Sequence, residues 1–306
     1  MTAWKNYHTP QTTEEALATL EQYRGEARII AGGTDLMIDL QHGSEAHPVP
    51  ALVDITRIPE LNQLDVTDGR CTLGAAVTHA RIVKSPVLES GATCLVESCG
   101  VVGGPQVRNV GTLGGNVAHA LPAADGTTSL IALDAEAQVA WHDGRREWLP
   151  LAALFKGAGV SALDHGRDLL VAFRFRLAGI REGSAFKRIM RPQGVALPIL
   201  GCAVWVRLNQ AGDHFHETRV CLAPVASTPV RAAEVEAALN GAPVSERTID
   251  AAVAAGLASL SPRTSRYRAT GEYRHLMIET LLRQALPLAV RRAQLGEAVA
   301  EGVGMG

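Results

Sequence analysis

The pattern of hydrophobic and polar positions divides the chain near Gly179. Before this point the apolar runs are short and are separated by glycine turns, which predicts short strands, hairpins and short helices. After it the apolar runs lengthen into long strands and then into long helices. The two patterns together predict an α+β fold with a first domain over residues 1–178, a second over 179–288 and a tail over 289–306.

The first domain opens with a pattern typical of a small β-α-β layer. Thr12 and Glu15 have the spacing of a capping box at the start of an amphipathic helix, and Gly25 is suited to end that helix. The apolar run at 28–31 predicts a strand, and the run at 51–55 predicts a second one.

The rest of the first domain is predicted to contain two β-hairpins and one longer strand. Asp68-Gly69 and Asp143-Gly144 are turn dipeptides between apolar runs. Residues 155–163 are glycine-rich and are expected to form a loop. Residues 169–177 alternate, which predicts a strand with one apolar face made of Leu169, Val171, Phe173, Phe175 and Leu177. We therefore divide the domain into subdomains of about 1–57 and 58–178.

The second domain is predicted to hold a three-stranded antiparallel sheet and three helices. The strands are expected at 186–190, 203–208 and 217–223, and the helices at 229–239, 245–260 and 266–286. After Pro287 we expect a short helix and then frayed, glycine-rich residues.

Composition and charge exclude several classes of protein. A hydrophobic content of 47% with 20% charged residues is typical of a globular protein. The net charge of −2 provides no basic surface for nucleic acid, and no apolar run reaches the roughly 18 residues of a membrane span. The first residues lack the pattern of a secretory signal, so we expect a cytoplasmic protein. The five cysteines have neither zinc-ribbon nor iron–sulfur spacing and are expected to be buried thiols.

Two glycine-rich stretches are candidates for a binding site. The stretch ARIIAGGTDL at 27–36 predicts a buried strand that runs directly into a glycine turn. The stretch GTLGGNVAHALPAAD at 111–125 places three glycines, an amide and a carboxylate in one short segment. Neither matches the dinucleotide fingerprint or the phosphate loop. Taken alone, each is explained by a tight turn before a capped helix, but two such loops could also close on one elongated, phosphate-containing ligand.

Several motifs, in this order, resemble one known family. They are AGGTDL at 31–36, TLGGN at 112–116 followed by Pro122 and Asp125, DLL at 168–170, SAFK at 184–187 and YRATGEYR at 267–274. Over nearly its whole length the chain is similar to the FAD-binding middle (medium) subunit of the molybdenum hydroxylases, which include xanthine dehydrogenase, carbon monoxide dehydrogenase and aldehyde oxidoreductases. The resemblance implies an oxidoreductase with a two-part FAD-binding domain of the PCMH type. The cysteine-bearing insert of the 4-hydroxybenzoyl-CoA reductases is absent from the sequence, which argues against that branch.

The resemblance also implies which residues hold FAD, namely Ile29, Ile30, Ala31, Gly32, Gly33, Thr34, Asp35, Leu36, Val102, Gly111, Thr112, Leu113, Gly114, Gly115, Asn116, Asp125, Leu170 and Lys187. The amides of Gly32, Gly33, Gly114 and Gly115 are expected to bind the diphosphate, with Gly114 and Gly115 at positive φ.

The remaining expected contacts are made by side chains. Asp125 is expected to accept hydrogen bonds from sugar hydroxyls, and Val102 and Leu170 to pack on the flavin ring. Lys187 is expected to approach the polar edge of the ring. Arg108 and His119 are interpreted as loop residues, and no catalytic or metal-ligating residue is expected.

The sequence contains no iron–sulfur cysteine set and nothing that suggests a molybdopterin site. The resemblance therefore implies one part of an electron relay, in a heterotrimer or a dimer of heterotrimers. A small partner subunit would hold [2Fe–2S] clusters, a large one the molybdopterin cofactor, and this chain the FAD that delivers electrons to NAD, quinone or oxygen. Two alternatives stay open: a self-contained FAD-dependent oxidase or reductase, and a binding or scaffolding protein that has lost flavin. The intact glycine stretches and Asp125 argue against the latter.

Overall fold

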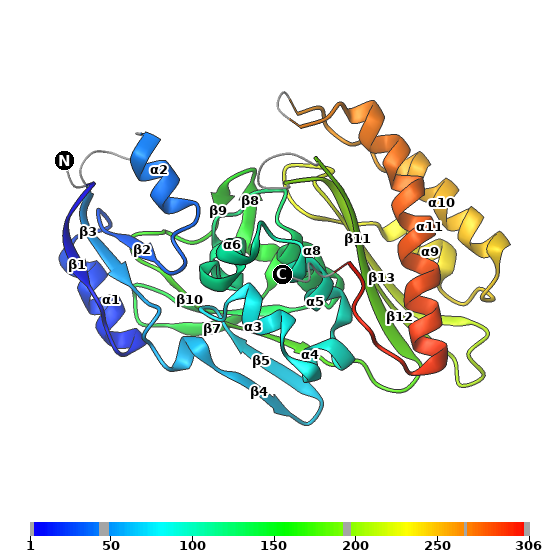
Figure 1. Ribbon diagram of the computed structural model, residues 1–306, viewed down its shortest axis with the longest axis horizontal. Coiled ribbons are helices and arrows are strands. Elements are labelled where there is room, and N and C mark those ends of the chain that lie inside the picture. Colours follow the sequence, from blue (N-terminus) through cyan, green and yellow to red (C-terminus); the bar gives the residue numbers. More distant parts are fainter. Residues whose placement is uncertain (1–2, 43–48, 192–196, 266–267, 303–306) are drawn as a thin grey trace.

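The computed structural model describes residues 3–42, 49–191, 197–265 and 268–302. Its elements form three parts that lie in a row along the longest axis of the molecule (Figure 1). An N-terminal layer with a parallel sheet is followed by a central part with an antiparallel sheet, and then by a C-terminal sheet covered by helices. The α+β class predicted from the sequence is confirmed.

The N-terminal layer is a three-stranded parallel sheet in the order β1-β3-β2, accompanied by two helices. Its elements are β1 (Trp4–His8), α1 (Thr13–Gln22), β2 (Arg28–Ile30), α2 (Leu36–His42) and β3 (Val49–Asp54). Thr12 caps α1 as predicted, because its side chain accepts a hydrogen bond from the Glu15 amide. The sequence pattern does not predict β1, since this edge strand has no buried side chain and no apolar run.

The central part is built on a five-stranded antiparallel sheet in the order β4-β5-β10-β6-β7. The strands are β4 (Leu64–Thr67), β5 (Arg70–Gly74), β6 (Glu136–Ala140), β7 (Arg146–Pro150) and β10 (Leu169–Arg176). Short helices pack around it: α3 (His79–Val83), α4 (Pro86–Gly91), α5 (Thr93–Gly100), α6 (Pro105–Val110), α7 (Leu113–Ala118) and α8 (Asp125–Ala132), with 3-10 turns at Glu60–Asn62 and Leu151–Leu154. Both predicted hairpins are confirmed.

Two expectations for the central part are wrong. Residues 155–163 are not a plain loop, because β8 (Phe155–Gly157) and β9 (Val160–Ser161) pair as a small hairpin. The predicted apolar face of β10 is divided, because its pairing with β6 shifts between Leu170 and Ala172. Before this bulge Leu169 packs into the core shared with α1, whereas Phe173 beyond it packs under the short helices.

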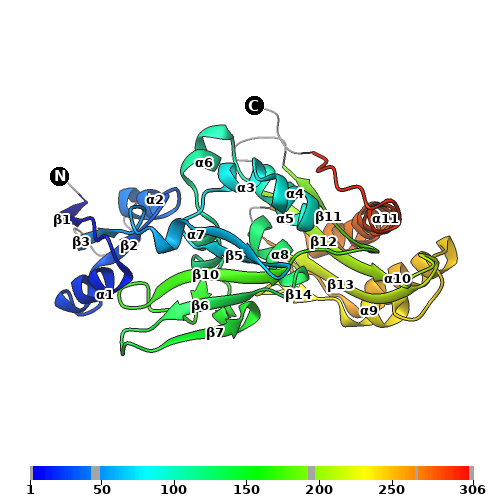
Figure 2. The same ribbon diagram turned by 90° about the horizontal axis from the view of Figure 1, so that it is seen from below.

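The C-terminal part contains the three predicted strands and three predicted helices. The strands β11 (Glu182–Met190), β12 (Pro198–Leu208) and β13 (Phe215–Ala223) pair antiparallel, and the two-residue β14 (Val230–Arg231) adds an edge that was not predicted. Helices α9 (Ala233–Leu239), α10 (Glu246–Ser259) and α11 (Gly271–Leu295) cover one face of this sheet (Figures 1 and 2).

The end of the chain differs from the expectation. Helix α11 does not stop at Pro287 but continues to Leu295, where Gly296 ends it with a φ of 68°. The residues after it are not frayed up to Gly302, because the Ala300 and Glu301 amides donate to the carboxylates of Glu89 and Glu97. The expectation for 303–306 lies outside the described residues.

A buried ion pair joins the central and C-terminal parts. Arg292 on α11 donates to Glu97 on α5 at 2.6 Å, and both side chains are almost fully buried. Glu97 also accepts from the Phe186 amide of β11 at 2.7 Å, and Arg292 donates to the Ser184 carbonyl at 2.7 Å. Both carboxylate oxygens of Glu97 and both terminal guanidinium nitrogens of Arg292 thus have hydrogen-bond partners, which favours one relative placement of the two parts.

The five cysteines are free and buried, as expected. Among the described residues no helix is both long and apolar enough to cross a membrane.

Candidate functional site

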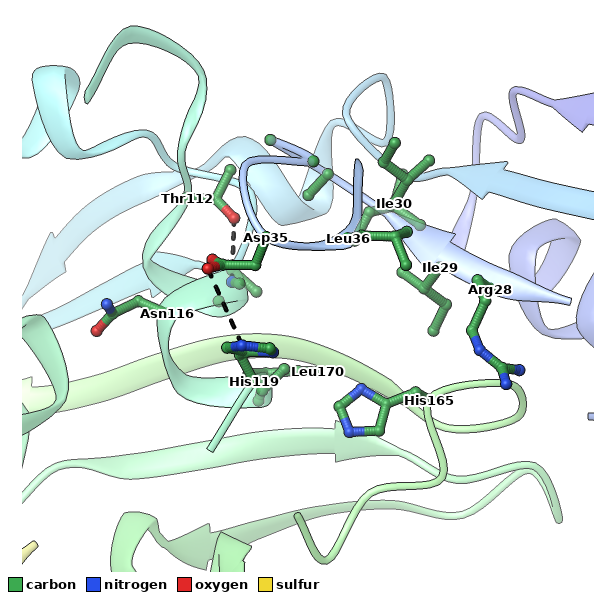
Figure 3. A pocket seen from close by; sticks show the side chains of 18 of the residues that line it. Arg28, Ile29, Ile30, Asp35, Leu36, Thr112, Asn116, His119, His165 and Leu170 are labelled. Carbon is green, nitrogen blue, oxygen red and sulfur yellow. Dashed lines mark hydrogen bonds and ion pairs between the residues drawn. The ribbon is translucent and has the colours of Figure 1, made fainter. Parts of the chain in front are cut away.

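A cavity of about 630 Å³ lies between the N-terminal layer and the central part (Figure 3). Its lining begins at Gly25 and ends at Leu170, so no described residue of the C-terminal part lines it. The stretch 28–36 forms one side, and residues of the 102–119 segment and of the 159–170 segment form the others. The two glycine stretches singled out in the sequence therefore meet at one cavity.

The first glycine stretch is a turn at the end of β2. Gly33 has a φ of 68°, which a residue with a side chain rarely adopts. In the described part of the chain, the amides of Gly32, Gly33 and Thr34 donate to no backbone carbonyl. These neighbouring N–H groups are therefore available to an acceptor in the cavity.

The second glycine stretch touches the first. A Cβ on Gly32 would lie 2.2 Å from the Val110 carbonyl oxygen and 2.7 Å from the Cα of Gly111. Only a glycine fits at position 32, because the obstacle is backbone on a separate segment. The two loops thus form one continuous wall.

Gly114 and Gly115 correct a prediction, because neither has a positive φ. Thr112 caps α7 by accepting the Gly115 amide at 3.0 Å, so these glycines form the first turn of a helix. The Gly114 amide donates to the Ala75 carbonyl at 2.8 Å. Both amides are therefore used within the protein, and the backbone donors expected at 114 and 115 are not free in this structure.

Polar side chains line the region around α7. His119 Nε2 and Asp35 Oδ1 are 3.9 Å apart and come from the two glycine stretches (Figure 3). Asn116 accepts both the amide and the hydroxyl of Thr127 at 3.2 Å, which fixes its side chain against α8. This region can bind hydroxyl or phosphate groups.

The other region of the cavity combines apolar and basic side chains. Ile29 of β2 lies near Arg28 and His165, and Leu170 of β10 lines the cavity next to His119 (Figure 3). The His165 carbonyl accepts the Ile29 amide at 3.4 Å, which ties this loop to the end of the strand. Apolar side chains from two separate sheets can hold a flat ring system between them.

Three expected residues lie outside the cavity lining. Leu113 is buried in the core, and Lys187 forms an ion pair with Glu301 at 2.7 Å. Asp125 forms an ion pair with Arg188 at 2.6 Å, and both side chains are buried. Burial raises the pKa of the Asp125 carboxyl, and the charge and hydrogen bond of Arg188 offset part of that rise.

Most of the expected residues do line the cavity: Ile29, Ile30, Ala31, Gly32, Gly33, Thr34, Asp35, Leu36, Val102, Gly111, Thr112, Gly114, Gly115, Asn116 and Leu170. Arg108 braces the loop beside Val102, as interpreted, by donating to the Gly103 carbonyl at 3.0 Å.

Sequence reasoning missed several polar lining residues, among them Arg28, His79, His119, Asp164, His165 and Asp168. Asp168 is buried and holds its loop by accepting from the Asp164 amide at 2.9 Å and from His142 Nδ1 at 2.9 Å. Arg28 and Asp168 lie within the stretches 27–36 and 168–170, but neither was assigned to the ligand there. His79, Asp164 and His165 lie outside every motif. Among the described residues no group of three or more His, Cys, Asp or Glu side chains could hold a metal ion.

Comparison with known proteins identifies the family. The family model "FAD binding domain in molybdopterin dehydrogenase" matches residues 2–175, and "CO dehydrogenase flavoprotein C-terminal domain" matches residues 184–289. The chain belongs to this FAD-binding family. It is 31% identical to the xanthine dehydrogenase FAD-binding subunit of Escherichia coli O157:H7, over 94% of this chain and 97% of that protein. It is 30% identical to the carbon monoxide dehydrogenase medium chain of Hydrogenophaga pseudoflava, over the same shares of the two chains.

Solved structures support the same membership. A carbon monoxide dehydrogenase structure from Hydrogenophaga pseudoflava, which lacks the Mo-pyranopterin moiety, superposes with a TM-score of 0.86 at 30% identity, covering 94% of this chain and 97% of that one. A Cu,Mo-CO dehydrogenase structure in its cyanide-inactivated form gives a TM-score of 0.87 at 27% identity, covering 96% and 100%. The flavoprotein described here is therefore an FAD-binding oxidoreductase subunit of the molybdenum hydroxylase family.

Proposed function

We propose that the cavity holds FAD in an extended conformation, with the diphosphate on the amides of Gly32, Gly33 and Thr34. The observation that carries this placement is the set of three neighbouring amides that donate to no backbone carbonyl among the described residues, next to a second glycine stretch. A diphosphate supplies the anionic acceptors that such a concave backbone binds. The cavity volume of about 630 Å³ lies within the range of cofactor sites.

The two regions of the cavity suggest how the rest of the cofactor lies. Ile29 and Leu170 are suited to hold the flat flavin ring, and Asn116 and His119 are suited to bind hydroxyl groups. We retain Asp125, Leu113 and Lys187 only as residues that act indirectly, because they lie outside the lining.

We further propose that this chain is the electron-exit subunit of a larger complex. FAD, when bound, can accept electrons singly and release them singly or in pairs. The chain would receive electrons from [2Fe–2S] clusters of a small partner and deliver them to NAD, quinone or oxygen. The large partner would hold the molybdopterin cofactor and oxidise the substrate, in a cytoplasmic heterotrimer.

One finding supports the relay. Two relatives that match this chain along 94% of its length are named as a subunit or a medium chain of a dehydrogenase.

Stopped-flow spectroscopy of the reconstituted complex tests the proposal. After substrate addition, bleaching of the clusters should precede bleaching of the flavin, and the chain alone should retain FAD but oxidise no substrate. Flavin that stays oxidised while the clusters are reduced would rule out an electron exit here. Substrate oxidation by the chain alone would support the self-contained flavoenzyme instead.

A further inference from the structure

One buried side chain of the cavity wall lacks a partner. His79, the first residue of α3, is 2% exposed and lines the cavity. Its Nδ1 is sealed from solvent and has no hydrogen-bond partner among the described residues. A buried polar atom without a partner is costly, and a ligand bound in the adjoining cavity can offset that cost if the ring turns its nitrogen towards it.

The ring of His79 lies behind the junction of the two glycine stretches. The His79 amide donates to the Gly111 carbonyl at 3.0 Å, and a Cβ on Gly111 would lie 3.4 Å from the ring carbon Cδ2. Gly111 in turn touches Gly32. A half-turn of the imidazole exchanges the places of Cδ2 and Nδ1, which brings the nitrogen to the side of the glycines.

Charge around His79 favours an anion over a cation. Arg108 is the charged group whose field acts on the ring, and its guanidinium is mostly buried. Burial first, and the Arg108 charge second, lower the pKa of His79 to about 4. At neutral pH the ring is therefore uncharged and carries one N–H that can be donated.

We propose that His79 is a diphosphate-binding residue that donates a ring N–H to a phosphate oxygen of the bound dinucleotide. The inference rests on the proposed placement of FAD, with its diphosphate at Gly32–Thr34. It adds a side-chain donor from α3 to the backbone donors of the first glycine stretch. The Nδ1 atom, which has no hydrogen-bond partner among the described residues, gains one on binding.

The test compares His79→Leu, His79→Gln and the control His216→Leu, which replaces an exposed histidine on β13 outside the cavity lining. FAD and ADP are titrated into each apoprotein, because both carry the diphosphate. His79→Leu should weaken both ligands by roughly 10- to 100-fold, since a hydrogen bond to a charged group is lost. His79→Gln should lose less than His79→Leu, and the control should bind like the wild type.

Thermal unfolding of the apoproteins separates this role from a structural one. His79→Leu should unfold at the wild-type temperature or above it, because it removes a buried atom without a partner. Wild-type affinity of His79→Leu for FAD and ADP would overturn the proposal, and so would a loss of affinity accompanied by a lower unfolding temperature. Failure of the wild type to bind FAD would instead contradict the proposed function.

Discussion

At the scale of single residues, two adjacent glycines of the site have opposite surroundings. A Cβ on Gly114 would lie 2.5 Å from the Ala75 carbonyl oxygen and 2.7 Å from the Ala75 side chain. A Cβ on Gly115 would meet only the Thr112 hydroxyl, at 3.1 Å, and Gly115 lines the cavity. Gly114 thus allows close packing of the protein, and Gly115 leaves space for the ligand.

This difference predicts separate outcomes for two variants. Gly115→Val should keep the circular dichroism spectrum of the wild type but bind FAD at least tenfold more weakly, because its side chain enters the cavity. Gly114→Ala should lower the free energy of unfolding by about 1–3 kcal/mol, because backbone of another segment must move. Circular dichroism with urea and flavin fluorescence titration measure both effects. Equal FAD affinity of Gly115→Val and the wild type would contradict the placement of the ligand.

The lowered pKa of His79 predicts that the stability of the FAD-free chain depends on pH. The folded value of about 4 lies below the ordinary value of 6.5, so the unfolded chain takes up a proton that the folded chain cannot. The contribution of neutral His79 to the free energy of unfolding of the apoprotein should therefore be fully present above pH 6.5. It should be lost progressively as the pH drops from 6.5 towards 4. Urea unfolding at pH 7 and pH 5 should show a smaller drop for His79→Leu. An identical drop in both proteins would show that His79 does not contribute.

Most of the residues that line the cavity could be named from the sequence, but the interaction partners of the charged side chains could not. Gly32 and Asn116, which short local motifs carry, both line the cavity. It could not foresee that Arg188 neutralises Asp125, or that Glu301 pairs with Lys187, because these partners come from distant strands and from the tail. His79 lay outside every motif.

At the scale of elements, periodicity predicted most helices and strands. It failed where tertiary packing determines the register of a strand or the end of a helix. The bulge in β10 is set by its pairing with β6, which no local pattern reveals. Helix α11 continues through Pro287 because Leu286 and Ala289 on either side are fully buried against the sheet. This burial outweighs the lost helical hydrogen bond, which costs about 3 kcal/mol.

Pro287 therefore offers a stabilising change. The residue is exposed, so Pro287→Ala leaves no hole and restores an amide donor inside α11. The free energy of unfolding should rise by up to about 3 kcal/mol, measured with urea. Gln284→Ala, at another exposed position of the helix, should change it by less than about 0.5 kcal/mol. A lower stability of Pro287→Ala would mean that α11 needs the proline to follow the sheet.

At the scale of the whole molecule, the site and the joint between the parts are separate. The cavity is lined by the N-terminal and central parts, whereas Glu97 and Arg292 fix the C-terminal part to the central one. The change of pattern near Gly179 predicts a domain boundary between the central and C-terminal parts. The sequence could not predict the joint, because Glu97 and Arg292 are 195 positions apart and neither lies in a recognisable motif.

The joint can be tested without touching the site. Arg292→Met should lower the free energy of unfolding by about 3–5 kcal/mol, because the Glu97 carboxylate stays buried without its partner. Adding Glu97→Gln should recover part of the loss, since the side-chain carbonyl of Gln can still accept the Phe186 amide. The control Arg291→Met removes the exposed neighbouring arginine and should cost less than about 0.5 kcal/mol. FAD affinity, measured below the unfolding transition, should stay within about twofold of the wild type in all three, because no lining residue belongs to α11. A large loss of FAD affinity in Arg292→Met without unfolding would mean that the C-terminal part shapes the cavity from a distance.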